Sequence, residues 1–379
     1  MPSGRISLLM ISNFGVADGG RETWAYNFIP RLLRRWPEIH LDLIGLHRVG
    51  QQDNSARLAG LLGGRGSTTF LTSARKRFPI LSMLRQAPRQ LTTSKHPRPD
   101  LVIGVGSIME LLVILASPSL RRSRRIIWLR TVLLQERSGQ LGRLGRAGRA
   151  LERRLLRSAD LLIANGEDTA KHYRAYGLDV KVIPNGVDLD RWRALPPKLV
   201  GSLRVVLVGR LIAHKGLAEY LALAKRMHGS GFEFHVIGEG PYEHEALKAQ
   251  REGWLVCHGV KPNDELPALI ATMDVCACFA LEGAGGGVSN ALLEQMASGR
   301  VILAWNNMIY RQLLDETNAW LVTQSNVDEA ESALQEIAER PDDARRRAAA
   351  AEQSAQRFSF DGHVEQFVSL AEPLLANRP

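Results

Sequence analysis

Short apolar runs alternate with longer mixed segments along almost the whole chain. Runs of strand-forming residues lie at 6–11, 41–46, 100–105, 125–130, 160–165 and 180–184, and the pattern then starts again at 203–209, 232–238, 254–259, 274–280, 301–305 and 319–322. Strands that alternate with helical segments are typical of α/β domains with a parallel sheet. The pattern therefore predicts two successive α/β domains.

The segment that joins the two series of strands, from Pro184 to Gly201, is rich in Pro, Gly and Asn and has the composition of a hinge. A chain of 379 residues is also too long for one ordinary core and fits two domains. We predict an N-terminal domain over 1–187 and a C-terminal domain over 188–360. The last helix, at 361–379, is expected to pack back on the first domain.

The composition favours a cytoplasmic protein. No apolar run reaches the ~18 residues that a membrane span needs, and the apolar stretch at the N-terminus is too short for a signal peptide. The three cysteines, Cys257, Cys276 and Cys278, lack the spacing of a zinc site and fit a reducing compartment. We expect no bound metal and no cofactor.

The net charge of +10 is unevenly distributed. Residues 1–200 carry +18 and residues 201–379 carry −8, and the arginines gather at 75–77, 121–125 and 137–157. Anionic membrane headgroups attract such segments, which would place the protein on the inner face of a membrane. The same pattern also fits an arginine-rich surface helix that only solvates the fold. Nucleic acid is not indicated, since no interleaved aromatic residues accompany the charge.

The stretch at 282–299, EGAGGGVSNALLEQMASG, carries the clearest sign of a ligand site. A glycine-rich turn runs directly into an amphipathic helix, and the first N–H groups of a helix favour phosphate. Glycines at 283 and 285–287 let the backbone approach a ligand closely. Glu294 interrupts the apolar side of the helix, where a carboxylate needs a polar partner such as a ribose diol.

Six motifs in order resemble those of the retaining glycosyltransferases of family 4. They are GGRE at 19–22, PNGVDLDRW at 184–192, VGRLIAHKG at 208–216, VIGEGP at 236–241, CHGV at 257–260 and GVSNALLEQMASG at 287–299. The resemblance covers nearly the whole chain. It implies the GT-B architecture, in which two Rossmann-like parallel-sheet domains face a central cleft, with the acceptor in the first domain and a nucleotide-sugar donor in the second.

The resemblance also implies roles for individual residues. Arg210 and Lys215 would hold the diphosphate and stabilise the charge that develops on the leaving group; the alternative is a pair of surface salt bridges. Glu294 would bind the ribose hydroxyls, unless it is an exposed helix acid. The implied donor site comprises Gly19, Gly20, Gly209, Gly238, Val260, Gly285, Gly286, Gly287, Val288, Ser289, Asn290 and Glu294.

The sequence departs from the family pattern in the glycine-rich loop. Family members carry a glutamate eight positions before the one that matches Glu294, and here that position is Gly286. One interpretation is that the loop is longer and Glu282 takes the missing catalytic role. In the other, Glu282 only begins the loop, and backbone amides hold the transferred sugar.

A second departure follows the run at 125–130. Many relatives have a histidine where this chain has Arg130, which is expected to face the acceptor side of the cleft. Arg130 could contact an anionic part of the acceptor or donor, or be one more surface arginine. The pair Asp188 and Asp190 resembles a metal-binding motif, but it lies in a turn segment.

The expected reaction moves a sugar, such as a hexose, from a UDP- or GDP-linked donor to a hydroxyl of a glycan or lipid-linked acceptor, with retention at the anomeric carbon. This glycosyl transfer would be a step in the synthesis of a cell-surface polysaccharide or glycoconjugate. Two alternatives stay open: a sugar-nucleotide epimerase of the same architecture, and a non-catalytic basic scaffold. A dehydrogenase is disfavoured, since no GxGxxG motif follows a strand with an acid ~20 residues on.

Overall fold

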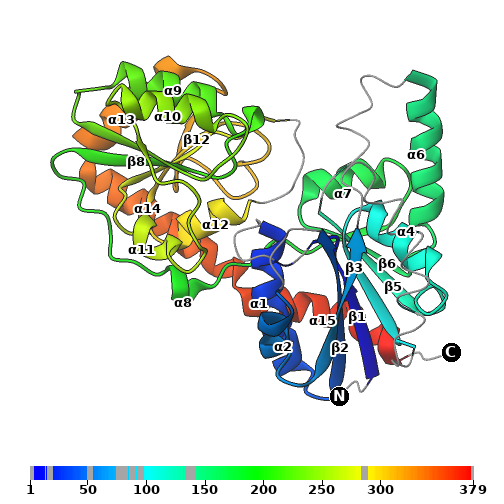
Figure 1. Ribbon diagram of the computed structural model, residues 1–379. Helices are drawn as coiled ribbons and strands as arrows, with labels where there is room; N and C mark the ends of the chain where they lie inside the picture. The colour runs from blue at the N-terminus through cyan, green and yellow to red at the C-terminus, as the bar shows by residue number, and fades with distance from the viewer. Residues whose placement is uncertain are drawn as a thin grey trace. The chain divides into compact units, whose positions relative to one another are not determined.

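The structure is a computed structural model that describes residues 4–12, 14, 20–48, 54–73, 84, 91, 98–130, 132, 142–282 and 289–376. The chain forms two compact units. Unit 1 combines the described residues up to Pro184 with the segment that starts at Asp361, and unit 2 comprises the described residues between Asn185 and Phe360. Figure 1 shows a sheet with surrounding helices in each unit.

Unit 1 is built on a seven-stranded sheet with the order β3-β2-β1-β4-β5-β6-β7. Every neighbouring pair in this sheet is parallel. The strands are β1 (Gly4–Leu9), β2 (Ile39–Arg48), β3 (Gly66–Ser73), β4 (Leu101–Gly106), β5 (Arg124–Leu129), β6 (Leu161–Ala164) and β7 (Val180–Val182).

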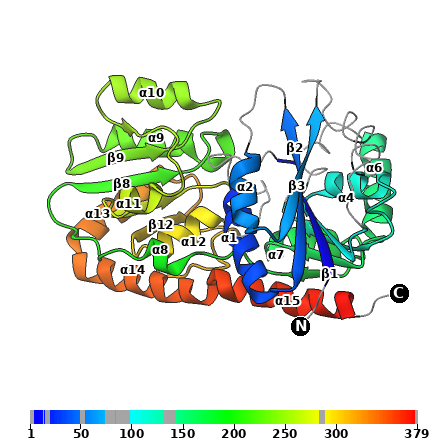
Figure 2. The same ribbon diagram turned by 60° about the horizontal axis from the view of Figure 1, so that its bottom comes forward.

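Helices cover both faces of this sheet. They are α1 (Gly20–Arg35), α2 (Ser55–Leu62), α4 (Ile108–Ala116), α6 (Gly142–Leu156), α7 (Glu167–Arg174) and α15 (Phe360–Ala376). Figure 2 shows α1 and α2 on one side of the strands and α4 and α6 on the other. Fully buried strands such as β4 have apolar residues along their length because both of their faces are covered.

An aromatic cluster fixes α1 and α15 against β5. The ring of Trp128, on β5, stacks on Phe367 of α15 at 5.5 Å and meets Trp24 of α1 edge-on at 5.0 Å. Trp24 Nε1 donates to His363 Nε2 at 2.7 Å, and His363 Nδ1 lies 2.6 Å from the carbonyl oxygen of Pro184. Burial lowers the pKa of His363 to about 3, so the ring stays neutral and can accept the tryptophan hydrogen bond.

Unit 2 repeats the design with a six-stranded parallel sheet of order β10-β9-β8-β11-β12-β13. Its strands are β8 (Leu203–Val208), β9 (Phe232–Ile237), β10 (Val256–Cys257), β11 (Val275–Cys278), β12 (Val301–Trp305) and β13 (Trp320–Val322). Its helices are α8 (Leu189–Trp192), α9 (Leu217–Arg226), α10 (Glu243–Arg251), α11 (Leu266–Ile270), α12 (Asn290–Ala297), α13 (Val327–Glu339) and α14 (Pro341–Ala355), with single turns at Ala213–Lys215 and Gln356–Phe358.

The two sheets confirm the predicted α/β class with two Rossmann-like domains. In each, the strand order reverses beside the first strand, between β1 and β4 in unit 1 and between β8 and β11 in unit 2. All the predicted runs contain strands, although several strands begin or end a few residues away from the predicted limits. The edge strand β3 was not predicted, because its sequence GSTTFLTS is mostly polar and half-exposed.

Candidate active site

The point where the strand order of unit 2 reverses holds a small hollow. In open parallel sheets, ligands bind beyond the carboxyl ends of the strands at such a point. The hollow is lined from β8, from β11 and from the start of α12, and its lining includes Val208, Lys215, Cys278, Ser289, Gln295 and Tyr310. The topology and the hollow therefore indicate the same edge of the sheet.

Three neighbouring loops run close together at this edge. The N–H of Gly209 donates to Ile237 O at 3.0 Å, and the N–H of Gly238 donates to Gly259 O at 2.9 Å. A Cβ at Gly238 would collide with the carbonyl oxygen of Gly209, and φ at Gly238 is +135°, so only glycine fits there. Val260 follows, with its side chain 37% exposed.

Two cations lie beside the hollow, and the described residues offer neither of them an acidic partner. Arg210 is exposed two residues after the end of β8, and Lys215 is half-buried at the end of the turn Ala213–Lys215. Burial lowers the pKa of Lys215, and the positive charge of Arg210 lowers it further. Within the described part of the chain, no carboxylate forms an ion pair with either side chain. Like charges held together in this way are typical of a site that binds an anion.

Gly216 fixes the position of this lysine turn. It adopts the left-handed conformation, with φ at +73°, and a Cβ would strike the carbonyl oxygen of Phe279. The N–H of Leu281 donates to His214 O at 2.9 Å, which ties the same turn to the loop after β11. The GRLxxxKG pattern thus places its lysine by backbone packing, which explains why the motif ends in glycine.

The loop after β11 is held by residues that the sequence motifs did not identify. Tyr310 Oη accepts from the N–H of Ala280 at 2.9 Å, and Asn307 Nδ2 donates to Ala280 O at 3.0 Å. Gln324 Oε1 accepts from Asn307 Nδ2 at 2.8 Å and from the N–H of Glu282 at 3.0 Å. The sequence did contain a signal for two of them. Asn307 and Tyr310 follow the predicted strand at 301–305, and the other site loops were recognised because they also follow predicted strands.

Glu294 lies on α12, where its carboxyl group is half-buried. Burial raises its pKa to about 7, while the charge of Arg191 on α8 acts in the opposite direction. In the described residues no side chain or backbone group donates a hydrogen bond to this carboxylate. A carboxylate in these surroundings gains stability from hydroxyl donors supplied by a ligand.

The N-terminus of α12 borders the hollow through Ser289 and Ala291. Ser289 is the extended N-cap residue, and its side chain makes no capping hydrogen bond. Asn290, the first helical residue, is half-buried. The positive end of this helix dipole therefore lies at the same edge of the sheet as Arg210 and Lys215, and it also favours an anion.

Some predicted residues cannot be placed. Gly19, Gly285, Gly286, Gly287 and Val288 lie outside the described residues. Glu282 is described and its side chain is exposed. Whether Glu282 replaces the family glutamate stays a prediction.

Two further predicted positions lie in unit 1. Gly20 is the first residue of α1, and Arg130 directly follows β5. Arg130 is not a surface arginine, because only 8% of it is exposed.

The described residues contain no group of three His, Cys, Asp or Glu side chains arranged to hold a metal. Asp188 of the DLD motif instead precedes α8 as its N-cap residue. The motif therefore has a structural explanation at the start of a short helix.

Two family models match the chain in succession. The model described as Glycosyltransferase Family 4 matches residues 18–191, and the model described as Glycosyl transferases group 1 matches residues 202–340. The chain belongs to the family 4 glycosyltransferases. The predicted family is thus confirmed, and the two matches cover the described strands of both sheets apart from β1.

Relatives of known structure share the fold of this glycosyltransferase. The HepE protein of Anabaena in complex with UDP is 17% identical, with a TM-score of 0.73 over 97% of this chain and 100% of that one. Sucrose-phosphate synthase of Thermosynechococcus elongatus is 16% identical, with a TM-score of 0.77 over 98% of this chain and 99% of that one. These likenesses establish the GT-B fold.

One curated relative matches by sequence, the 2-deoxystreptamine glucosyltransferase of Streptomyces kanamyceticus. It is 28% identical over 143 residues, which is 33% of this chain and 36% of that protein. The match thus spans about a third of the length of that relative.

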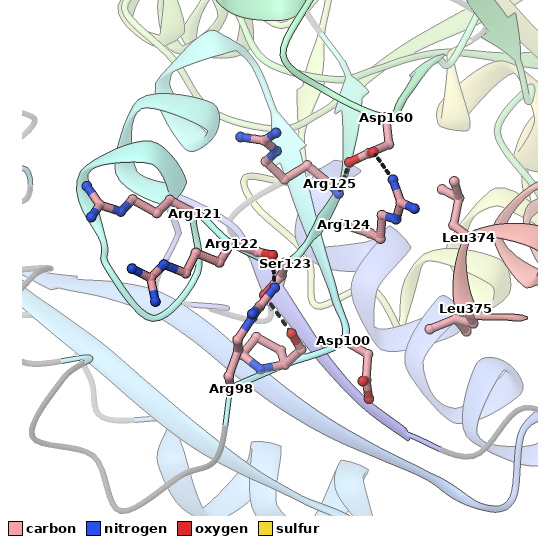
Figure 3. A pocket seen from close by; sticks show the side chains of 11 residues that line it. Arg98, Asp100, Arg121, Arg122, Ser123, Arg124, Arg125, Asp160, Leu374 and Leu375 are labelled. Atoms are coloured by element: carbon pink, nitrogen blue, oxygen red, sulfur yellow. Dashed lines mark hydrogen bonds and ion pairs between the residues drawn. The ribbon is translucent and has the colours of Figure 1, made fainter. Parts of the chain in front are cut away.

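A larger pocket of about 420 Å³ lies in unit 1, at the edge of the sheet where β4, β5 and β6 begin. Figure 3 shows Arg124 and Arg125 beside Asp160, with Arg121 and Arg122 lying away from it. Asp160 accepts from Arg124 Nη1 at 2.9 Å and from the N–H of Arg125 at 2.8 Å. This pocket contains none of the predicted site residues, so its size does not make it the active site of the glycosyltransferase.

Proposed function

We propose that this glycosyltransferase moves a sugar from a nucleoside-diphosphate donor to a hydroxyl group, and that unit 2 binds the donor. The observation that carries the proposal is the pair Arg210 and Lys215, which has no acidic partner in the described residues. It stands at the strand reversal of unit 2, where α12 also begins. Glu294, with its pKa raised to about 7, is assigned to the ribose hydroxyls.

The two cations would act on the leaving group. When the glycosidic bond breaks, the nucleoside diphosphate gains negative charge, so fixed cations stabilise the transition state more than the ground state. A bound diphosphate also offsets the repulsion between Arg210 and Lys215, which raises the pKa of the lysine again. The charges of the chain itself supply this stabilisation, and we propose that neither a metal nor an organic cofactor is required.

Replacing Arg210 by Ala tests the donor site. We expect the turnover number to fall by about 100-fold or more, as for removal of a group that stabilises developing charge. Arg251→Ala, an exposed change in the same unit, is the matched control and should leave the rate unchanged. Equal rates in both variants would show that Arg210 has no part in catalysis.

The donor base and sugar are proposed from the relatives. HepE is known in complex with UDP and with UDP-glucose, so UDP-hexoses are the first donors to test and GDP-hexoses the second. A thermal-shift screen of both nucleotides reads binding directly, because a ligand that binds the native state raises the melting temperature. If no nucleotide diphosphate shifts the melting temperature, the donor-site proposal is wrong.

Retention at the anomeric carbon is proposed from the family resemblance. Retaining glycosidases place two carboxylates about 5 Å apart across the reacting bond, whereas none of the described residues that line the hollow is a carboxylate. Front-face attack assisted by the departing phosphate fits this lining better than a double displacement. Proton NMR of the first-formed product decides the point, since the anomeric coupling constant of an inverted product would contradict retention.

The acceptor is proposed to be a glycan or a lipid-linked glycan, used in polysaccharide or glycoconjugate synthesis at the cytoplasmic face of a membrane. Exposed arginines near the amino-end edge of unit 1 support contact with anionic headgroups: Arg98, Arg121, Arg122, Arg153, Arg154 and Arg157. Among the described residues no helix is long and apolar enough to cross a bilayer. Flotation with anionic vesicles tests the contact, and a protein that stays unbound at low salt would contradict it.

Two other functions remain testable. A sugar-nucleotide epimerase of this architecture would release nucleotide or epimerised donor without any acceptor. A non-catalytic scaffold would show no turnover, and Arg210→Ala would leave its binding unchanged. The cations beside the hollow disfavour the scaffold, and the matches to two glycosyltransferase models favour the transferase over the epimerase.

A further inference from the structure

Arg130 is a buried cation, and the described residues give its guanidinium no carboxylate as an ion-pair partner. Its backbone N–H donates to Gly106 O at 2.8 Å, which holds the residue at the carboxyl end of β5. The guanidinium lies 5.2 Å from the centroid of the Trp24 ring, and Nη1 makes no hydrogen bond to any residue that the structure describes. An unpaired buried charge is costly to a native state, so a retained one points to a ligand.

Two carboxylates lie near Arg130, but their hydrogen bonds go elsewhere. Glu22 accepts from Ser12 Oγ. Glu110 accepts from the N–H of Ser107 at 2.8 Å and from the N–H of Ile11 at 3.3 Å. Neither forms an ion pair with Arg130 in the described residues.

Arg21 adds a second positive charge to this place. Its Nη1 lies 3.8 Å from Glu110 Oε1, a loose contact, and its side chain is 39% exposed. Burial lowers the pKa of Arg130 to about 9 and the charge of Arg21 lowers it further, while the charge of Glu22 acts in the opposite direction. Glu22 and Glu110 offset only part of the repulsion between the two arginines, and an oxyanion bound between them would offset more of it.

The location also fits a ligand site. Ile11 follows β1, Ser107 follows β4 and Arg130 follows β5, so the cluster stands where the strand order of unit 1 reverses. This is the edge at which parallel sheets bind their ligands. Because unit 2 has its own cations for the donor diphosphate, the pair in unit 1 is available for the other substrate.

We propose that Arg130 and Arg21 bind an oxyanion of the acceptor, a carboxylate or a phosphate, and so make this transferase selective for acidic acceptors. The inference rests on the proposed function. A guanidinium matches carboxylate and phosphate geometry with two parallel hydrogen bonds. A neutral acceptor would leave Arg130 unpaired, and the enzyme would therefore discriminate against it.

The first part of the test separates a ligand site from a structural role. Arg130→Met keeps an apolar stem against Trp24 and removes the charge, and Arg154→Met on α6 is the exposed control. We expect the melting temperature of Arg130→Met to equal or exceed that of the wild type. A clear fall, absent in the control, would show that Arg130 serves the fold and would overturn the proposal.

The second part measures binding by calorimetry with three probes: inorganic phosphate, methyl glucuronide and the neutral methyl glucoside. We expect the wild type to bind at least one acidic probe and not the glucoside; which acid binds distinguishes phosphate from carboxylate. Arg130→Met and Arg21→Met should each weaken that binding by 10-fold or more, with UDP or GDP binding changed less than 2-fold. Unchanged affinity for the acid would overturn the proposal.

Two outcomes separate this inference from the proposed function. If the nucleotides bind and the acidic probes do not, the donor site stands and the oxyanion site is wrong. If no nucleotide binds, the proposed function fails by itself, and the acidic probes still report on Arg130. A parallel loss of acid and nucleotide binding in Arg130→Met would assign the arginine to the donor, which overturns its assignment to the acceptor.

Discussion

Glu294→Gln should make the protein more stable while it weakens nucleotide binding. Burial raises the pKa of Glu294 from 4.5 to about 7, so the ionised side chain is less stable in the native state than in the unfolded chain. At about 1.4 kcal/mol per pKa unit, the cost of ionisation is roughly 3 kcal/mol above pH 7. A glutamine of the same shape does not incur this cost.

The pH dependence has a definite sign. Because the folded pKa is higher than the unfolded one, the wild type loses stability as the pH rises from about 4.5 through 7. The gap between Glu294→Gln and the wild type should therefore stay below about 1 kcal/mol at pH 5 and approach about 3 kcal/mol at pH 8. For a unit of this size, the pH 8 gap corresponds to a melting temperature higher by roughly 6–10 °C.

Urea unfolding and thermal melts between pH 5 and pH 8 measure this gap. Glu339→Gln, an exposed change at the end of α13, is the matched control and should show no gap. The second readout is calorimetry of nucleotide binding near pH 7. Ribose hydroxyls that stabilise the ionised form of Glu294 should make its carboxyl group release about half a proton when the nucleotide binds. A stability gap that is absent, or that grows toward low pH, would refute the assigned burial of Glu294.

Three further results are expected. Gly238→Ala should lower the free energy of unfolding of unit 2 by about 2–4 kcal/mol in urea, because its Cβ meets the carbonyl oxygen of Gly209; a stable variant would contradict the close packing of these loops. Tyr310→Phe removes the acceptor of the Ala280 N–H. It should lower the free energy of unfolding by about 1–2 kcal/mol and weaken nucleotide binding a few-fold in calorimetry, whereas unchanged values would show that the hydroxyl does not hold the loop. Burial raises the pKa of the Cys278 thiol to about 12, so mass spectrometry after treatment with a thiol reagent at pH 8 should find this residue modified only once the protein is unfolded; rapid labelling of the native state would contradict its burial.

The sequence predicted the elements whose burial leaves an apolar pattern. Every buried strand could be recognised from such a run, whereas β3, at the edge of its sheet and rich in Ser and Thr, could not. The sequence also placed Arg210, Lys215 and Glu294 at strand ends or on a helix, because their motifs are local. The residues of these motifs are the part of the candidate active site that the sequence predicted.

The rest of the site depends on contacts between distant segments. Asn307, Tyr310 and Gln324 hold the loop after β11 through hydrogen bonds that span 17 to 42 positions along the chain. The lack of an ion pair at Arg130 among the described residues is likewise a property of packing, since it depends on where Glu22 and Glu110 direct their oxygens. The spacing of residues in a single sequence does not reveal such long-range contacts.

The discontinuous make-up of unit 1 has a consequence for synthesis on the ribosome. Unit 2 uses the stretch from Asn185 to Phe360, but the aromatic cluster around Trp128 needs Phe367 and His363 from the last helix. The first domain to be translated is therefore the last to be completed, and its tryptophans stay without their final neighbours until the chain is nearly finished. Nascent chains arrested before α15 should display a finished unit 2 and an N-terminal sheet that chaperones still recognise.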